Sequence, residues 1–364
     1  MPQVIDRPGV DGESASIADS SAAPATDTRF AGKRVLITGA RGFLGTHLWQ
    51  ALQATGAELH GVVRTLPPDT SSGRIRWWQS DVSDASTMER VIQAVRPDIV
   101  YHLTSHAWGA PDLDKVLPTL RDDLVATVNV LTACVRAQVD RVITTGSSQE
   151  PEIVDGQCIP CSPYAAAKVA GGAYARMFHE VFGLRVVVVR PFMVYGPGQS
   201  PGKVIPYMIR SLLAGESPKL GQASHAVDWI YVDDAVRGLI EAAVVGGIEG
   251  QTLDLGSGRA VSLSAVADEI AALLPTTQRP KFGAMSRPLE QLRVADAQAT
   301  WRTLGWRAEV SMREGLRRTV AYWRAAAASP GQSGVQSRLL GGLGAPLLSL
   351  GDFAQHGASA MGFL

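Results

Sequence analysis

The sequence predicts an α/β fold of the Rossmann type, with a doubly wound parallel sheet and a smaller C-terminal substrate-binding lobe. Apolar, β-branched runs alternate with helical patterns through the first half of the chain. The runs expected as strands are 34–38, 59–63, 99–103, 141–145 and 185–190. Because these runs lack polar alternation, helices should cover both faces of the sheet. A glycine-rich segment directly after the first run supports the same fold class.

Composition divides the 364 residues into four parts. Residues 1–29 are rich in Ser, Ala, Asp, Thr and Pro without apolar periodicity, which predicts a disordered leader. Residues 30–190 form the predicted sheet domain. Residues 191–324 are expected to form a substrate-binding lobe interleaved with the last strands, and residues 325–364 a low-complexity tail. The helices expected in the lobe are 205–213, 232–244 and 264–274.

The charge balance argues against polyanion binding. The chain has 34 Lys and Arg residues and 34 Asp and Glu residues, so no net field recruits nucleic acid or an anionic membrane. No apolar run could span a bilayer, and the first thirty residues lack a signal-peptide pattern, which predicts a cytoplasmic protein. One C-x-x-C pair stands without a second pair or a histidine cluster, so we expect no metal site.

Three glycines follow the first predicted strand in a G-x-x-G-x-x-G spacing. They are Gly39, Gly42 and Gly45, and a helix is expected to begin near Phe43. Glycine is needed in such a turn because a side chain would block the turn itself, the approach of a pyrophosphate, or helix-to-strand packing. The segment therefore predicts binding of a nicotinamide dinucleotide, with Phe43 and Leu44 at the phosphate end.

The second predicted strand ends in Val63 and is followed by Arg64, where NAD enzymes usually carry an acid for the ribose 2′-hydroxyl. A guanidinium suits a 2′-phosphate, so the sequence favours NADP over NAD. In the alternative, Arg64 is simply exposed and another residue selects the cofactor. Asp81 and Val82 follow the next strand-like stretch, where the aspartate would contact the adenine amino group or occupy a turn.

The catalytic candidates are Tyr164 and Lys168, in the segment Y-A-A-A-K at the start of a helix expected over 164–182, before a break at Gly183. Hydride transfer at an alcohol carbon requires a group that takes or gives the hydroxyl proton. Helical spacing puts both side chains on one face, so the Lys168 ammonium can stabilise a tyrosinate and anchor the nicotinamide ribose. Ser147 and Ser148 follow the strand that ends at Thr145, and a hydroxyl there would bond the substrate oxygen.

With these motifs the chain resembles the extended short-chain dehydrogenases/reductases of the nucleotide-sugar epimerase and dehydratase family. The resemblance covers about residues 32–324. Further matching segments are Y-H-L ending at Leu103, R-P-F-M-V-Y-G-P-G-Q from Arg190, D-W-I-Y-V-D-D from Asp228, D-L-G-S-G from Asp254 and L-G-W from Leu304.

The resemblance implies roles for these residues. Tyr164 would be the acid/base and Lys168 its partner, and Ser147, or alternatively Ser148, would orient the substrate. Leu103 and Pro191 would contact the cofactor, which Tyr164 and Lys168 would also touch.

The resemblance also implies a nucleoside-diphosphate sugar as substrate. Arg287 would contact the diphosphate, or would be a solvated loop arginine. Family members often pair through the two helices that include Y-x-x-x-K, so a homodimer is expected.

Several departures from the family narrow the predicted chemistry. Sugar 4,6-dehydratases carry Asp and Glu directly after the catalytic hydroxyl residue, whereas Ser148 and Gln149 stand here, so elimination of water is not expected. Glu150 lies one position too far and would serve only in a shifted loop. Met193, the expected substrate contact, replaces an asparagine, and Val227 stands where an arginine is usual.

Asp123 also sits where many relatives have an asparagine. These losses permit a substrate without a nucleotide.

Three functions stay open. A 4-epimerase would hold NAD tightly and return the hydride to the other face of C4. A 4-ketoreductase would use NADPH, and G-S-S-Q-E from Gly146 resembles the G-S-S-E-E of enzymes that reduce GDP-4-keto-6-deoxymannose. The third function, a non-catalytic protein that senses a dinucleotide, disagrees with the joint presence of Ser147, Tyr164 and Lys168.

Overall fold

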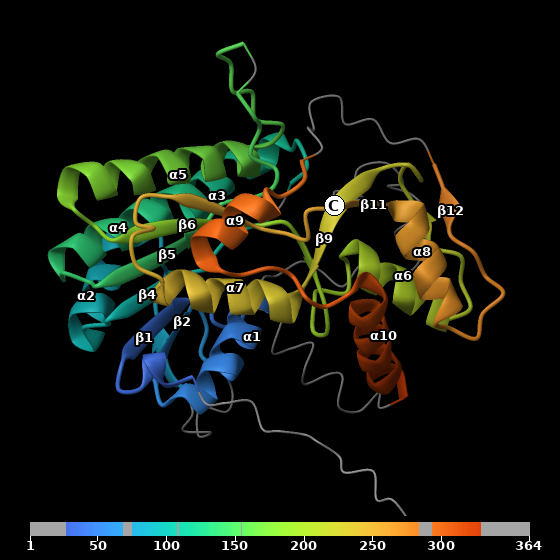
Figure 1. Cartoon of the computed structure of the whole chain (residues 1–364), viewed down its shortest axis with the longest axis horizontal. Helices are drawn as coiled ribbons and strands as arrows, with labels where there is room; N and C mark the ends of the chain where they lie inside the picture. The colour runs from blue at the N-terminus through green and yellow to red at the C-terminus, as the bar shows by residue number, and fades with distance from the viewer. Residues whose placement is uncertain (1–26, 68–74, 108, 154, 284–292, 329–364) are drawn as a thin grey trace, which may run out of the picture.

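The computed structural model describes residues 27–67, 75–107, 109–153, 155–283 and 293–328. Its centre is a seven-stranded parallel sheet with the order β10-β6-β5-β4-β1-β2-β3. Helices cover both faces of the sheet, and a smaller lobe lies beside it (Figure 1). The predicted fold class is therefore confirmed.

The strands of this sheet are β1 (Arg34–Thr38), β2 (Glu58–Val63), β3 (Arg76–Gln79), β4 (Ile99–His102), β5 (Arg141–Thr145), β6 (Val186–Pro191) and β10 (Thr252–Leu255). Five of them, β1, β2, β4, β5 and β6, begin and end within one residue of the predicted positions, and no bounds were predicted for β3 and β10. β1 pairs with both β2 and β4, so the chain reverses its direction of travel across the sheet at β1. In open parallel sheets, ligands bind outside the carboxyl ends of the strands at such a reversal point.

Side chains of the central strands alternate between two apolar cores. Val35 and Ile37 of β1 belong to one core, and Leu36 belongs to the other. One face carries α1 (Phe43–Leu52) and α7 (Val232–Val244), and the other carries α2 (Ala85–Val95), α4 (Ala126–Arg136) and α5 (Pro163–Phe182) (Figure 1). This two-sided burial explains why the strand segments read as continuous apolar runs.

Both ends of α5 follow from local chemistry. The Ser162 hydroxyl accepts a hydrogen bond from the Ala165 amide at 3.1 Å, and Pro163 occupies the first turn, where its missing amide costs nothing. Gly183 ends the helix with φ at 68°, a left-handed conformation that favours glycine. The predicted break at Gly183 is thus confirmed.

Between α2 and α4 the chain forms a short irregular helix. Its parts are η3 (Leu113–Lys115), α3 (Val116–Thr119) and the π-helical segment η4 (Leu120–Val125). A π-helical turn carries one extra residue relative to an α-helix and is often found at functional sites. Here it contains two consecutive buried acids, Asp122 and Asp123.

The smaller lobe contains two short sheets, which the sequence had not predicted. The strands are β7 (Met193–Tyr195), β9 (Ala226–Tyr231) and β11 (Ala260–Ser262) in one sheet, and β8 (Lys219–Leu220) and β12 (Lys281–Phe282) in the other. The helices are α6 (Val204–Leu213), α8 (Leu263–Ala272), α9 (Ala297–Leu304) and α10 (Met312–Ala328), of which α9 packs against β10 of the main sheet.

Helical segments cross both predicted outer boundaries. The single turn η1 (Thr28–Phe30) spans the boundary after residue 29, and the Arg29 guanidinium pairs with Asp27 and with Glu241 of α7, each at 2.7 Å. At the other end α10 continues to Ala328 through a run of alanines, the best helix former. Residues 1–26 and 329–364 lie outside the described residues. In the described part, no helix is long and apolar enough to cross a membrane.

Candidate active site

The turn between β1 and α1 is built around missing side chains. Gly39 has φ at 69°, and a Cβ there would lie 2.8 Å from the Thr104 amide nitrogen. A Cβ on Gly45 would collide with the Gly39 carbonyl oxygen. Gly42 caps α1, which begins at Phe43 as predicted. The turn thus brings backbone amides and the helix N-terminus to one spot, which suits a phosphate.

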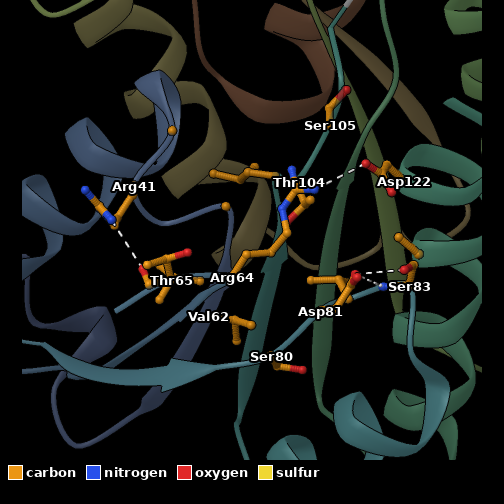
Figure 2. Close-up of a pocket in the computed structure, with 16 residues that line it drawn as sticks. Arg41, Val62, Arg64, Thr65, Ser80, Asp81, Ser83, Thr104, Ser105 and Asp122 are labelled. Atoms are coloured by element: carbon orange, nitrogen blue, oxygen red, sulfur yellow. Dashed lines mark hydrogen bonds and ion pairs between the residues drawn. The ribbon is translucent and has the colours of Figure 1, made fainter. Parts of the chain in front are cut away.

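A cleft opens beside this turn at the carboxyl ends of β1, β2 and β4 (Figure 2). Six of the predicted cofactor residues line it: Gly39, Gly42, Arg64, Asp81, Val82 and Leu103. Phe43, Leu44 and Gly45 belong to the helix behind the turn. The glycine turn lets a pyrophosphate approach the backbone amides, and Arg41 and Arg64 supply positive charge, so the cleft fits a dinucleotide.

Seven polar residues that line the cleft were not predicted from the sequence: Arg41, Thr65, Ser80, Ser83, Thr104, Ser105 and Asp122. Thr104 and Ser105 had a signal, because they come directly after a predicted strand whose carboxyl end points to the site. Arg41 lies inside the glycine segment. Asp122 had no signal, since it reaches the cleft through the π-helical segment.

Opposite charges meet across the cleft. Arg64 Nη1 lies 3.4 Å from Asp122 Oδ2, and Arg41 donates to the Thr65 carbonyl at 3.2 Å. Asp81 accepts hydrogen bonds from the Ser83 amide and hydroxyl at 3.0 and 2.7 Å. Burial acts to raise the pKa of the Asp81 carboxyl, but the Ser83 hydrogen bonds together with the charges of Arg121 and Arg64 outweigh it and leave this pKa below its ordinary value. Asp81 therefore holds its own turn.

The structure brings Tyr164 and Lys168 together on α5. Lys168 Nζ donates to the Thr145 carbonyl at 3.0 Å and lies 3.2 Å from the Thr145 hydroxyl, at the end of β5. It lies 5.6 Å from the centroid of the Tyr164 ring and 4.0 Å from Asp123 Oδ1. Lys168 is buried and Tyr164 half-buried, so a fixed ammonium stands beside an accessible phenol.

Ser147 lies in a turn that orients its hydroxyl. Its oxygen accepts a hydrogen bond from the Gln149 amide at 3.1 Å, which leaves the hydroxyl proton for another acceptor. The Ser147 amide donates to Glu150 Oε1 at 2.6 Å, and the Glu150 amide donates back to the Ser147 carbonyl at 3.1 Å. Ser148 follows in the same turn and is half-buried.

The Glu150 carboxylate faces the protein. Its second oxygen lies 3.6 Å from Arg190, and Arg293 donates to the Glu150 carbonyl at 2.9 Å. Burial raises the pKa of Glu150, although the Ser147 amide and the nearby cations act against the rise. The loop is not shifted in the way that would free Glu150 for elimination of water. Instead, the hydrogen bonds between Glu150 and Ser147 position Ser147.

The other predicted substrate residues contribute apolar surface or fall outside the described residues. Met193 lies in β7 and Val227 in β9, and both pack against the core of the lobe. Pro191 ends β6. Arg287 lies outside the described residues. The described residues include no cluster of His, Cys, Asp or Glu that could hold a metal ion.

A parallel sheet with a glycine turn at its reversal point, beside a tyrosine and lysine couple, defines a dinucleotide-binding enzyme. The model of the NAD dependent epimerase/dehydratase family matches residues 35–256, and the chain belongs to this family. It is an NAD(P)-dependent enzyme of the extended short-chain dehydrogenase/reductase type.

Individual relatives differ in their reactions. The UDP-glucose 4-epimerase of Mycolicibacterium smegmatis is 30% identical over 80% of this chain and 98% of its own length. A dTDP-4-dehydro-6-deoxy-D-allose reductase of a Streptomyces species is 28% identical over 74% of this chain and 92% of its own. Among solved structures, MoeE5 in complex with UDP-glucuronic acid and NAD is 31% identical with a TM-score of 0.73, and the match covers 80% of this chain and 99% of MoeE5.

Proposed function

We propose that the chain transfers a hydride to or from C4 of the sugar in a nucleoside-diphosphate sugar. The observation that carries the proposal is the Lys168 ammonium, fixed by Thr145 at the end of β5 and lying 5.6 Å from the centre of the Tyr164 ring. This couple provides a proton-transfer group beside the cofactor cleft. Two relatives that are named for nucleotide sugars, and MoeE5 in complex with UDP-glucuronic acid, are 28–31% identical and support this substrate class.

Each of the three residues has one task in this mechanism. A bound nicotinamide would supply or accept the hydride. The deprotonated Tyr164 oxygen takes the proton of the C4 hydroxyl during oxidation, and the Tyr164 phenol gives a proton to the C4 oxygen during reduction. The Lys168 ammonium favours the tyrosinate form electrostatically, and it needs no rearrangement because Thr145 already holds it. Ser147 donates its free hydroxyl proton to the C4 oxygen, since the Gln149 amide occupies a lone pair of its own oxygen.

Two outcomes of this chemistry are distinguished by the cofactor. A 4-epimerase would keep its NAD through the cycle, and the relative named UDP-glucose 4-epimerase favours this outcome. A 4-ketoreductase exchanges NADPH each turnover, and the two arginines that line the cleft, Arg41 and Arg64, favour a 2′-phosphate. The dinucleotide released from denatured protein separates them: tightly retained NAD supports the epimerase, and an empty site that prefers NADPH supports the reductase.

The function itself is tested with UDP-glucose, UDP-glucuronic acid and a dTDP-4-keto-6-deoxy sugar as probes. Turnover of a probe should fall by roughly 10²–10⁴ in Tyr164→Phe, because positioned acid–base catalysis is worth that much. NADH affinity should stay within about twofold, as a control for folding. Dinucleotide binding without turnover of any probe would contradict the proposal and favour a dinucleotide sensor or a substrate without a nucleotide.

A homodimer through α5 and the irregular helix before α4 remains our proposal for the assembly. These elements expose large apolar side chains: Leu113, Leu117, Leu120, Tyr174, Val181 and Phe182. Clusters of exposed apolar side chains are typical of interfaces. Light scattering should give twice the chain mass of 38.6 kDa. Leu117→Arg should give the single-chain mass if Leu117, 72% exposed here, is buried in the dimer.

A further inference from the structure

An ion pair crosses the cofactor cleft. Arg64 follows β2 on one wall, and Asp122 belongs to η4 on the other. The Arg64 side chain extends across the space between the walls toward Asp122 (Figure 2), where Nη1 lies 3.4 Å from Oδ2. The pair thus occupies the part of the cleft between the glycine turn and Asp81, where an adenosine ribose would enter.

The two partners are held unequally. The Asp122 side chain is 10% exposed, and its other oxygen lies 2.8 Å from Arg121 Nε. The Arg64 side chain is 41% exposed and reaches Asp122 from the far wall. The Asp122 carboxylate is largely buried and also pairs with Arg121, whereas the Arg64 side chain is long and partly exposed. Arg64 is therefore the partner that moves when a ligand enters.

We propose that Asp122 determines cofactor specificity by competing with the 2′-phosphate of NADP for the Arg64 guanidinium. This inference rests on the proposed role of Arg64 as the 2′-phosphate ligand. A 2′-phosphate bound to Arg64 would replace Asp122 as the partner of the guanidinium. The phosphate would then lie near the Asp122 carboxylate, and the two negative charges would repel each other. NAD has a hydroxyl at this position, so it suffers no such repulsion. Asp122 therefore lowers the preference for NADP that Arg64 and Arg41 create.

The test measures dissociation constants of NADPH and NADH with purified full-length protein, by quenching of tryptophan fluorescence. In Asp122→Asn the affinity for NADPH should rise by about 3–10-fold, the range expected for a partly buried charge pair. The affinity for NADH should change by less than about twofold. Asp122→Ser serves as a second variant with the same expectation. Asp114→Asn makes the same change in net charge on the exposed turn η3 and should leave both constants unchanged.

The dependence on Arg64 is tested by repeating Asp122→Asn in an Arg64→Gln background. There the gain in NADPH affinity should fall to about twofold, because the Arg64 guanidinium for which Asp122 competes is gone. An equal gain in both backgrounds would overturn the competition.

Weaker binding of both cofactors in Asp122→Asn would also overturn the proposal, since Asp122 would then be a ligand of the shared adenosine. Unchanged or equally tightened constants for NADPH and NADH would overturn it too. None of these measurements uses a sugar substrate, so failure of the proposed C4 chemistry would show separately, as absent turnover with normal binding.

Discussion

The cofactor turn and the smaller lobe bring distant segments together in different ways. At the cofactor turn, segments approach closely because side chains are missing: a Cβ on Gly39 would lie 2.8 Å from the Thr104 amide, and one on Gly45 would meet the Gly39 carbonyl. In the smaller lobe, and where it meets α7, separate segments are joined by the side-chain carboxylates of Asp228 and Asp234. A side chain added to a glycine should therefore disrupt the cofactor turn, and removal of a carboxylate acceptor should disrupt the lobe.

Asp228 shows the second of these ways most clearly. It is 1% exposed, and its two oxygens accept hydrogen bonds from the Ser257 amide and hydroxyl at 2.7 and 2.6 Å, the Gly258 amide at 2.9 Å and the Ala295 amide at 3.0 Å. One side chain of β9 thus fastens the loop after β10 and the segment before α9. Buried amides need such partners because an unpaired one costs the full desolvation penalty.

Asp234 at the start of α7 does the same for the segment before α10. Its Oδ2 accepts hydrogen bonds from the amides of Glu309 and Val310 at 3.0 and 2.8 Å. The lobe is therefore assembled through carboxylate contacts between residues 29–76 positions apart.

Asp228→Ala should have the largest effect on stability. It leaves three amides without acceptors, and we expect the free energy of unfolding to fall by roughly 3–5 kcal/mol. Urea denaturation followed by circular dichroism measures the loss. At low denaturant, the folded fraction should still bind NADH with an unchanged dissociation constant, because the cofactor turn does not depend on Asp228.

The matched control is Asp233→Ala in the same D-W-I-Y-V-D-D segment. The Asp233 side chain is 53% exposed and lies 3.3 Å from Arg318, so its removal should cost less than about 1 kcal/mol. Equal losses in the two variants would show that the hydrogen bonds of Asp228 do not hold the lobe.

Gly45→Ala should have the converse effect. Its methyl group would overlap the Gly39 carbonyl and lie 2.8 Å from the Ala40 Cα, so the turn must shift. Stability should fall by about 1–3 kcal/mol, the usual cost of overpacking. The dissociation constant for NADH should rise at least about tenfold, since the amides of the turn move away from the phosphates. Fluorescence titration measures this change.

Gly246→Ala provides the control, because no atom lies within 4 Å of a Cβ at that position. It should leave the NADH affinity unchanged. An affinity within twofold of wild type in Gly45→Ala would mean that the turn does not bind the pyrophosphate.

The parts of the fold that depend on local sequence signals could be predicted, and the parts that depend on contacts between distant residues could not. Strand and helix positions in the sheet domain follow from continuous apolar runs and from glycines at fixed spacing, which are local signals. β1, β5, α7 and the end of α5 at Phe182 were predicted to the residue. The Y-x-x-x-K spacing likewise placed Tyr164 and Lys168 on one helix face, as the structure has them.

Contacts between distant residues had no local signal. The pair Arg64–Asp122 joins positions 58 apart, and the π-helical segment that aims Asp122 into the cleft has no recognised sequence pattern. The short strands β7 and β11 were missed because each has three residues beside Pro- and Gly-rich stretches. Glu150 was noted only as a displaced acid, since its contact with Ser147 depends on the fold of the turn.

Glu150→Gln should have the smallest effect on stability. It tests a turn that needs both a missing side chain, at Gly146, and a carboxylate acceptor, at Glu150. Gly146 leaves room for the carboxylate, because a Cβ there would collide with it, and the carboxylate in turn accepts the Ser147 amide. Glutamine keeps an acceptor for that amide but removes the charge that faces Arg190, Lys168 and Arg293.

The sign of the pH dependence follows from the raised pKa. Folded Glu150 holds its proton to higher pH than the unfolded chain, whose value is near 4.5, so the ionised form costs stability at neutral pH. As the pH falls from 7 toward 5, wild type should gain stability relative to Glu150→Gln, which has no proton to bind. We expect a relative change in Tm of about 1–3 °C between these pH values, measured by differential scanning calorimetry. Parallel curves for the two proteins would mean that Glu150 titrates in the fold as it does in water, and that the Ser147 amide and the cations around it fully offset its burial.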